Sequence, residues 1–377
     1  PFCRSRFADN VAPMSLVAAR IEHGVIGAVL ALLGCGSPAP ARVIPPPQPV
    51  AAAPAPKEPL PIPVSIPLGA CDLAKDLEPL PAPPIQSGPE VSRDNLQAHL
   101  DVLADPQLHG REAGSMDNRR VARWIADRFA AYGLPPSPEK NHCIPFDRSG
   151  VQDQNVVAHL QRQAQADAPV ILVGAHYDAQ GMRDVDVFPG ADDNASGVAA
   201  LLEIARISKM RPNGPNLVFV AFGAEERGLL GARAYVESPT IPLTKIVLMV
   251  NLDMVGRPML DRSPMRLLIP KADETIGYVI GPRDKPQTQD ILDRAAEREN
   301  RPILGIPEVV LTRLGFASDS VPFSPHMPTI FLSTGDHADY HRPTDTPEKI
   351  DFEQLARAVR LTLAIIDEAT RSRNAGP

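Results

Sequence analysis

The sequence predicts an α/β fold with a mostly parallel central sheet flanked by helices on both faces. Several short, nearly continuous apolar runs have the length and composition of strands that are buried on both sides. Amphipathic segments with helical periodicity lie between or after these runs. Polar residues follow directly after the apolar runs, and ligands of such folds gather at the carboxyl ends of parallel strands. We therefore expect a functional site at this edge of the sheet.

The first 35 residues have the pattern of an export signal. Arg20 precedes an apolar run over residues 25–33, which is too short for a membrane-spanning helix of about 20 residues but fits a signal peptide. The sequence LLGC, which ends at Cys35, resembles the lipobox of bacterial lipoproteins. We expect residues 1–35 to be a signal peptide with an upstream extension and Cys35 to carry a lipid anchor. The alternatives are ordinary secretion without a lipid and a disordered tail that is no export signal.

A proline-rich segment follows the predicted signal. Residues 36–89 contain 17 prolines in 54 residues, so this stretch lacks the backbone donors that a packed element needs. We interpret it as a disordered tether, with a processed pro-segment as the alternative, and residues 90–377 as one domain. The protein is then a cell-envelope lipoprotein of the periplasm or outer membrane, or a secreted protein. In such oxidising surroundings Cys71 and Cys143 either pair or stay apart.

The domain alternates between the two kinds of element. The apolar runs that we interpret as strands lie at residues 170–174, 217–222, 245–250 and 329–332. The segments with helical periodicity lie at residues 91–104, 121–134, 197–207, 229–236, 289–299 and 352–369.

Charge and cysteine content exclude some classes of function. The formal net charge of -7 offers no basic excess to neutralise phosphates, so we expect no nucleic-acid partner. The four cysteines show no CxxC spacing, which argues against a thiolate zinc site or a redox motif. The HExxH motif of another class of zinc protease is absent, and His337 reads as a loop histidine.

Side chains of the types that bind metal ions follow each predicted strand. Singly, each has an ordinary explanation: a structural histidine, an aspartate that caps a helix, or a solvated glutamate pair. Together they would meet in one cleft, where that many carboxylates repel one another unless a cation is bound. Mixed nitrogen and oxygen ligands without thiolate favour zinc. These residues are His176, Asp178, Asp192, Asp193, Glu225, Glu226, Asp253, Tyr340 and His341.

The order and spacing of five motifs resemble the co-catalytic two-zinc aminopeptidase family of bacterial leucyl-type enzymes, whose relatives include glutamate carboxypeptidases and glutaminyl cyclases. The resemblance covers roughly residues 91–366. The motifs are GAHYD, PGADDNASGV, FGAEERGLLG, NLDMVGR and DYHRPTDTPEKID. A further segment, SDSVPF, resembles a pocket segment that often reads SDHxPF, with Ser320 in place of the histidine.

The resemblance implies a site that holds two Zn²⁺ ions. His176 and Asp253 match ligands of the first ion, and Glu226 and His341 match ligands of the second. Asp192 matches the carboxylate that bridges the two ions.

The neighbouring residues match supporting roles. Asp178 matches the acid that orients His176, and Asp193 is interpreted as a helix cap. Glu225 matches the general base, which accepts a proton from the attacking water and passes it to the departing amine. Tyr340 lies where some members place a tyrosine that donates to the oxyanion.

The implied activity is hydrolysis of the N-terminal peptide bond of peptides. Acidic residues in the cleft favour a substrate with a positively charged, free amino terminus. Three alternatives remain: a hydrolase of another amide such as an acylated amino acid, a glutaminyl cyclase, and an inactive relative that only binds. This chain has DDNASG where the sequence of a glutaminyl cyclase resembles TDSxxP, which argues against a cyclase. The complete set of ligands argues against an inactive relative.

Overall fold

The chain of the computed structural model divides into two units. One unit, Pro1–Pro67 with Pro264–Pro270, lies outside the described residues. The predicted signal peptide, its Cys35 and most of the tether therefore remain predictions. The structure describes residues 78–136, 141–162, 169–262, 278–280, 286–300, 303–306 and 317–374, all within the second unit.

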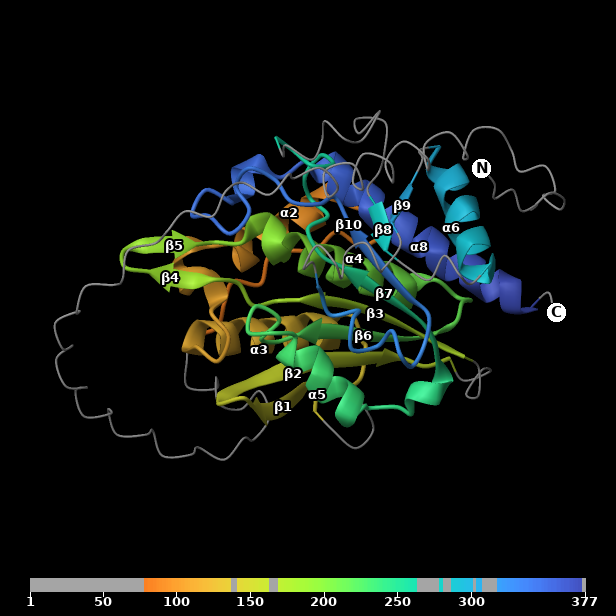
Figure 1. Ribbon diagram of the computed structural model, residues 1–377, viewed down its shortest axis with the longest axis horizontal. Coiled ribbons are helices and arrows are strands. Elements are labelled where there is room, and N and C mark those ends of the chain that lie inside the picture. Colours follow the sequence, from red (N-terminus) through yellow and green to blue (C-terminus); the bar gives the residue numbers. More distant parts are fainter. Residues whose placement is uncertain are drawn as a thin grey trace, which may run out of the picture. The chain divides into compact units, whose positions relative to one another are not determined.

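An eight-stranded sheet forms the centre of this unit, in the order β1-β2-β6-β3-β7-β10-β8-β9 (Figure 1). The pairs β3–β6, β3–β7, β7–β10 and β8–β9 are parallel, whereas β1–β2, β2–β6 and β8–β10 are antiparallel. The predicted mostly parallel sheet is thus confirmed. Its strands are β1 (Cys143–Arg148), β2 (Val151–Leu160), β3 (Val170–His176), β6 (Asn216–Phe222), β7 (Ile246–Leu252), β8 (Tyr278–Ile280), β9 (Leu304–Ile306) and β10 (Thr329–Ser333).

Helices cover both faces, as predicted. Serine side chains begin the first two: Ser92 accepts a hydrogen bond from the backbone N–H of Asn95, and Ser115 from that of Asn118. A separate hairpin of β4 (Gly181–Arg183) and β5 (Asp186–Phe188) lies at one end of the sheet (Figure 1). The helices are α2 (Arg93–Leu103), α3 (Met116–Ala131), α4 (Gly197–Met210), α5 (Leu230–Glu237), α6 (Pro286–Glu299) and α8 (Phe352–Asn374).

Alternate side chains of the central strands pack on opposite faces, because successive residues of a strand point to opposite sides. On one face, Ile171 and Val173 of β3 join the core formed with α2, α3, α4, α6 and α8. On the other face, Val170 and Leu172 pack with α5 and with Phe323. β3 and β6 are buried along their whole length, which explains their unbroken apolar runs. No helix among the described residues is long and apolar enough to cross a membrane.

Residues that precede the predicted boundary at residue 90 contact the domain. The Trp124 ring N–H donates to the Pro81 carbonyl at 2.7 Å, and Arg206 donates to the carbonyls of Gly88 and Glu90. Leu80 packs against the main core. Proline prevents this segment from forming a helix or strand, but its free carbonyls still accept hydrogen bonds from the domain.

Cys143 lies at the start of β1 and is disulfide-bonded. Its partner lies outside the described residues, so the pairing with Cys71 remains a prediction.

Candidate metal centre

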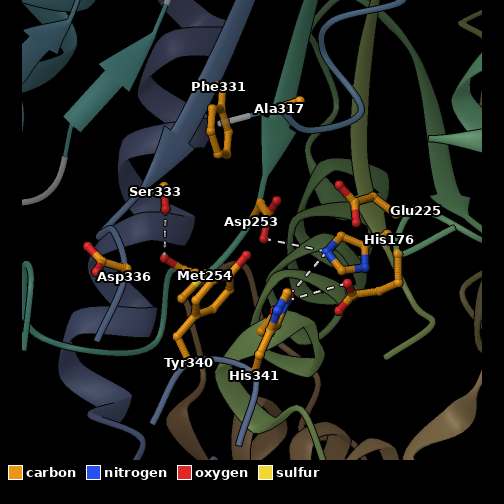
Figure 2. Close-up of a pocket in the computed structure, with 12 residues that line it drawn as sticks. His176, Glu225, Asp253, Met254, Ala317, Phe331, Ser333, Asp336, Tyr340 and His341 are labelled. Carbon is orange, nitrogen blue, oxygen red and sulfur yellow. Dashed lines mark hydrogen bonds and ion pairs between the residues drawn. The ribbon is translucent and has the colours of Figure 1, made fainter. Parts of the chain in front are cut away.

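Four neighbouring strands deliver the predicted residues to one place. His176 ends β3, and Asp253 follows the last residue of β7. Glu226 lies on the loop after β6, and His341 lies on the loop after β10. Because β6, β3, β7 and β10 are adjacent and parallel, their carboxyl ends meet at one edge of the sheet. Figure 2 shows the imidazoles of His176 and His341 beside each other in the resulting pocket.

The side chain of Asp193 lies between these two histidines. Its Oδ1 is 3.4 Å from His176 Nε2, and its Oδ2 is 3.1 Å from His341 Nε2. Each imidazole nitrogen faces a second carboxylate as well, with Asp253 Oδ1 3.5 Å from His176 and Glu226 Oε2 3.4 Å from His341. Two groups of three donors thus share one carboxylate.

These separations fit zinc. Ligand atoms about 2.0–2.1 Å from a tetrahedral zinc ion lie roughly 3.3–3.4 Å from one another. The four distances around Asp193 range from 3.1 to 3.5 Å. Glu226 also keeps a buried oxygen, Oε1, that has no hydrogen-bond partner among the described residues. The donor set would hold one ion with His176, Asp193 and Asp253, and another with His341, Asp193 and Glu226.

The structure corrects the predicted roles of the adjacent aspartates. Asp192 Oδ1 accepts a hydrogen bond from Gly256 N at 2.7 Å, and its Oδ2 faces His337 Nε2 at 3.4 Å, away from the two donor groups. Asp193 takes the shared position and does not cap α4; the Asn194 side chain accepts the hydrogen bond from Gly197 N, at the first residue of that helix, at 3.0 Å. The reason is local: Asp193 and Asn194 have non-helical backbone angles within the single turn Ala191–Ser196, so helical geometry does not place their side chains.

Asp178 is fully buried behind the first donor group. Its Oδ1 lies 3.6 Å from His176 Nδ1, on the side of the ring opposite Asp193. The same carboxylate accepts hydrogen bonds from the backbone N–H groups of Glu225 and Glu226 at 3.0 and 3.1 Å. Asp178 therefore fixes the loop after β6 as well as facing the imidazole, which the sequence did not reveal.

Glu225 lies beside the first donor group, close to His176 and Asp253 (Figure 2). Burial raises the pKa of its carboxyl well above the usual value; His176 opposes this rise, and Asp319 and Asp253 add to it. A carboxyl with a raised pKa next to the reaction centre is suited to accept and return a proton.

The members of the second donor group, His341, Asp193 and Glu226, shift one another's pKa values. Burial lowers the pKa of His341, but its contacts with Asp193 and Glu226 outweigh burial and raise that pKa to about 10. Burial and the Asp193 charge raise the pKa of Glu226 to about 7. Protonated His341 therefore balances part of the negative charge of Asp193 and Glu226, as a bound cation would.

Tyr340 lines the same pocket. Its ring stacks on His341, with centroids 3.9 Å apart and planes at 25°, and the side chain is 37% exposed. Burial of the phenol and the nearby carboxylates, Asp193 foremost, raise its pKa, so the hydroxyl stays protonated and able to donate at neutral pH. The remaining wall of the pocket includes Met254, Ala317, Phe331, Ser333 and Asp336 (Figure 2).

Further residues, to which the sequence gave no predicted role, hold the donors in place. Ser318 Oγ donates to Asp253 Oδ2 at 2.7 Å and accepts from Asn251 Nδ2 at 2.7 Å. Gln180 Nε2 donates to Glu226 Oε2 and lies 3.2 Å from His341 Nε2. Such contacts orient ligands and strengthen metal binding.

A second acidic cluster supports the turn that carries Asp193. The Asp345 carboxylate accepts hydrogen bonds from the backbone N–H groups of Asp192 and Asp193 at 3.0 to 3.1 Å. His337, which the sequence suggested to be a loop histidine, is buried against Asp192. This cluster fixes the backbone beneath the metal centre.

Comparisons with known proteins show which family the chain resembles. Residues 155–366 match the model of peptidase family M28. The uncharacterized protein YfbL of Escherichia coli (strain K12) is 28% identical over 311 residues, which cover 74% of this chain and 88% of YfbL. Aminopeptidase YwaD of Bacillus subtilis (strain 168) is 33% identical over 226 residues, which cover 58% of this chain but only 45% of YwaD.

The fold also resembles the crystal structure of BSAP, a zinc aminopeptidase from Bacillus subtilis. The TM-score is 0.58 at 18% identity, covering 75% of this chain and 96% of BSAP. Since the family model matches residues 155–366, more than half of the sequence, the chain belongs to peptidase family M28.

Proposed function

We propose that this protein is a zinc aminopeptidase that hydrolyses the N-terminal peptide bond of peptides and uses two zinc ions. The observation that carries the proposal is the position of Asp193, whose two oxygens face the histidines of two separate donor groups. A carboxylate between two imidazoles can give one oxygen to each of two adjacent cations. A one-metal site, as in glutaminyl cyclases, would need only one of these two donor groups.

Zinc, when bound, polarises the scissile carbonyl and makes a water molecule easier to deprotonate. Glu225, buried beside His176 and Asp253, accepts the proton of the attacking water and delivers it to the departing amine. Tyr340 donates a hydrogen bond to the carbonyl oxygen as negative charge develops on it. Asp178 keeps His176 and the Glu225 backbone in place throughout.

The pocket favours a substrate with a free amino terminus. Its lining includes the carboxylates of Asp193, Glu225, Glu226, Asp253 and Asp336, while none of the described lining residues is a lysine or arginine. A protonated N-terminal amine is attracted to such a surface, whereas an acylated amine has lost the charge. This electrostatic preference favours an aminopeptidase over a hydrolase of acylated amino acids.

Amino-acid p-nitroanilides test the activity. The expected result is hydrolysis that a zinc chelator abolishes and added Zn²⁺ restores, with the N-acetylated forms of the same substrates cleaved far more slowly. Faster cleavage of the acetylated forms would favour the acylated amino acid alternative. Release of ammonia from an N-terminal glutamine without loss of that residue would favour a cyclase. No hydrolysis of any substrate by the zinc-loaded protein would contradict the proposal.

We also propose that the protein is exported and carries a lipid on Cys35. The disulfide of Cys143 supports export, because such bonds persist in oxidising compartments. In its natural host, the mature protein should partition into detergent, and a Cys35→Ala variant should lose this partitioning. A wild-type protein that stays in the aqueous phase would contradict the lipid anchor and leave the proposed activity untouched.

A further inference from the structure

Arg111 is the largest fully buried side chain among the described residues, and it lies beneath the metal centre. It follows His109 and Gly110 in a turn where all three residues have positive φ, between 47° and 71°. A Cβ on Gly110 would lie 2.3 Å from the carbonyl oxygen of Gly181, so only glycine permits this close approach. The turn directs Arg111 into the interior, where the residue is 1% exposed.

The guanidinium of Arg111 joins three segments that are distant in sequence. Its Nε donates to the Tyr177 carbonyl at 3.0 Å, and its Nη2 donates to the Gly190 carbonyl at 3.0 Å. Its Nη1 donates to the carbonyls of Pro189, at 2.6 Å, and of Leu103, the last residue of α2. Arginine suits this position because its donors diverge within one rigid plane.

Two of these segments carry the metal donors. Tyr177 lies between His176 and Asp178, and Gly190 begins the turn that leads to Asp193. Gly190 has φ 57°, and a Cβ there would lie 2.1 Å from the Asp193 carbonyl oxygen and 3.2 Å from Arg111 Nη2. The guanidinium therefore lies directly against the backbone that sets the separation between the imidazole of one segment and the shared carboxylate of the other.

The positive charge of Arg111 lies close to the carboxylates of the site. Among the described residues no carboxylate lies within ion-pair distance of it, and its hydrogen bonds go to carbonyl oxygens. Burial lowers its pKa to about 10, against the field of Asp178, Asp345 and Asp193, so it remains charged at neutral pH. A buried cation without a paired anion is costly, and these nearby carboxylates offset the cost.

We propose that Arg111 is a positioning residue for the metal centre: it holds the end of β3 and the Pro189–Gly190 turn at the separation at which His176 and Asp193 bind one zinc ion. This inference rests on the proposed zinc-dependent function. It differs from a general packing role, because it predicts weaker zinc binding in a protein that is still folded.

Arg111→Lys tests the inference, with Arg206→Lys as the matched control. Lysine keeps the charge but has a single nitrogen, which cannot reach carbonyls on three segments. Arg206 is also buried, at 5% exposure, and also donates to two backbone carbonyls, those of Gly88 and Glu90, but these carry no metal donor. Zinc affinity is measured by competition with a chelator, and the stability of each metal-free protein by urea unfolding.

We expect Arg111→Lys to bind zinc at least 10-fold more weakly than wild type, and Arg206→Lys to bind it within about twofold, since residues that support ligands typically contribute 10–100-fold to affinity. Unchanged zinc affinity in folded Arg111→Lys, or an equal loss in Arg206→Lys, would overturn the inference. If Arg111→Lys does not fold, the same measurement is made on Arg111→Gln. If neither variant folds, Arg111 supports the fold of the whole domain, and the inference is overturned as well. A wild-type protein that binds no zinc would instead contradict the proposed function itself.

Discussion

Asp192 and Asp193 are adjacent in the chain but serve different clusters. Asp193 lies between His176 and His341, at 3.4 and 3.1 Å, whereas Asp192 accepts a hydrogen bond from Gly256 N and faces His337. Two side chains of identical chemistry therefore occupy one donor position and one supporting position, and their replacement separates metal binding from backbone support.

Asp193→Asn is expected to lower zinc binding at both positions. The substitution removes a full negative charge from between the two donor groups and leaves an amide, which is a poor bridge between cations. Burial opposes the ionised form of Asp193, but its contacts with His176 and His341 outweigh burial and lower its pKa, so loss of this charge should reduce the stability of the metal-free protein. Zinc content after dialysis, measured by atomic absorption, should drop below one ion per chain.

Asp192→Asn is the matched control. The asparagine oxygen can still accept the hydrogen bond from Gly256 N, so zinc content should stay near two ions per chain. If Asp192→Asn loses zinc and Asp193→Asn retains it, the shared position belongs to Asp192 and the assignment made here is wrong.

Ser318→Ala should weaken zinc binding without unfolding the domain. The hydroxyl is the donor to Asp253 Oδ2 and in turn accepts from Asn251, so its loss frees the carboxylate to rotate. The expected fall in zinc affinity is about 10-fold or more. Ser324→Ala is the control, because Ser324 lies nearby in the chain but donates to the Val321 carbonyl. Equal affinities in the two variants would show that this hydrogen bond does not support the ligand.

Tyr340→Phe should reduce kcat and leave zinc content unchanged. The hydroxyl is removed, whereas the ring that stacks on His341 remains. Loss of one donor to a developing oxyanion typically lowers kcat by about 10²–10³-fold. A kcat within a factor of three of wild type would remove Tyr340 from the reaction.

Acid should destabilise the domain partly through His99. This side chain is fully buried, and burial, with minor contributions from Arg128 and Arg206, lowers its pKa from 6.5 to about 3. Since the unfolded chain takes up a proton below about pH 6.5 and the folded chain does not, stability falls as the pH decreases from 6.5 towards 3. This one group should account for about 2 kcal/mol of lost stability between pH 7 and pH 5.

His99→Gln should reduce this pH dependence, because glutamine does not titrate. Urea unfolding at pH 7 and pH 5 measures the difference, and the exposed His326→Gln variant serves as the control. An equal loss of stability between the two pH values in wild type and His99→Gln would contradict the role of buried, neutral His99.

The sequence was most informative where burial is complete. Residues 170–174 and 217–222 are unbroken apolar runs because β3 and β6 are buried on both faces, and the polar residues after them had to lie at the same edge of the sheet. β1 and β2 escaped prediction for the opposite reason. Pro145 interrupts β1 at the edge of the sheet, where a missing N–H is tolerated, and Asp153 and Asn155 place buried polar side chains within β2.

The rest of the site depends on contacts between distant loops. No periodicity distinguishes Asp192 from Asp193, because the turn that contains them, Ala191–Ser196, has non-helical backbone angles at Asp193 and Asn194. Arg111 and Gln180 acquire their positions only when the segments they contact have met in the folded chain. Their residue types alone carried no signal in the sequence.

Glu225→Gln, measured for both zinc content and turnover, tests whether Glu225 is the general base of a two-zinc centre. Glutamine is nearly isosteric with glutamate but cannot accept the proton, while the backbone N–H of residue 225 still donates to Asp178. We expect the variant to bind two zinc ions per chain and its kcat on p-nitroanilide substrates to be about 10²–10⁴-fold lower than that of wild type. Turnover within 10-fold of wild type, or loss of a zinc ion, would contradict the assignment of Glu225 as the general base of a two-zinc centre.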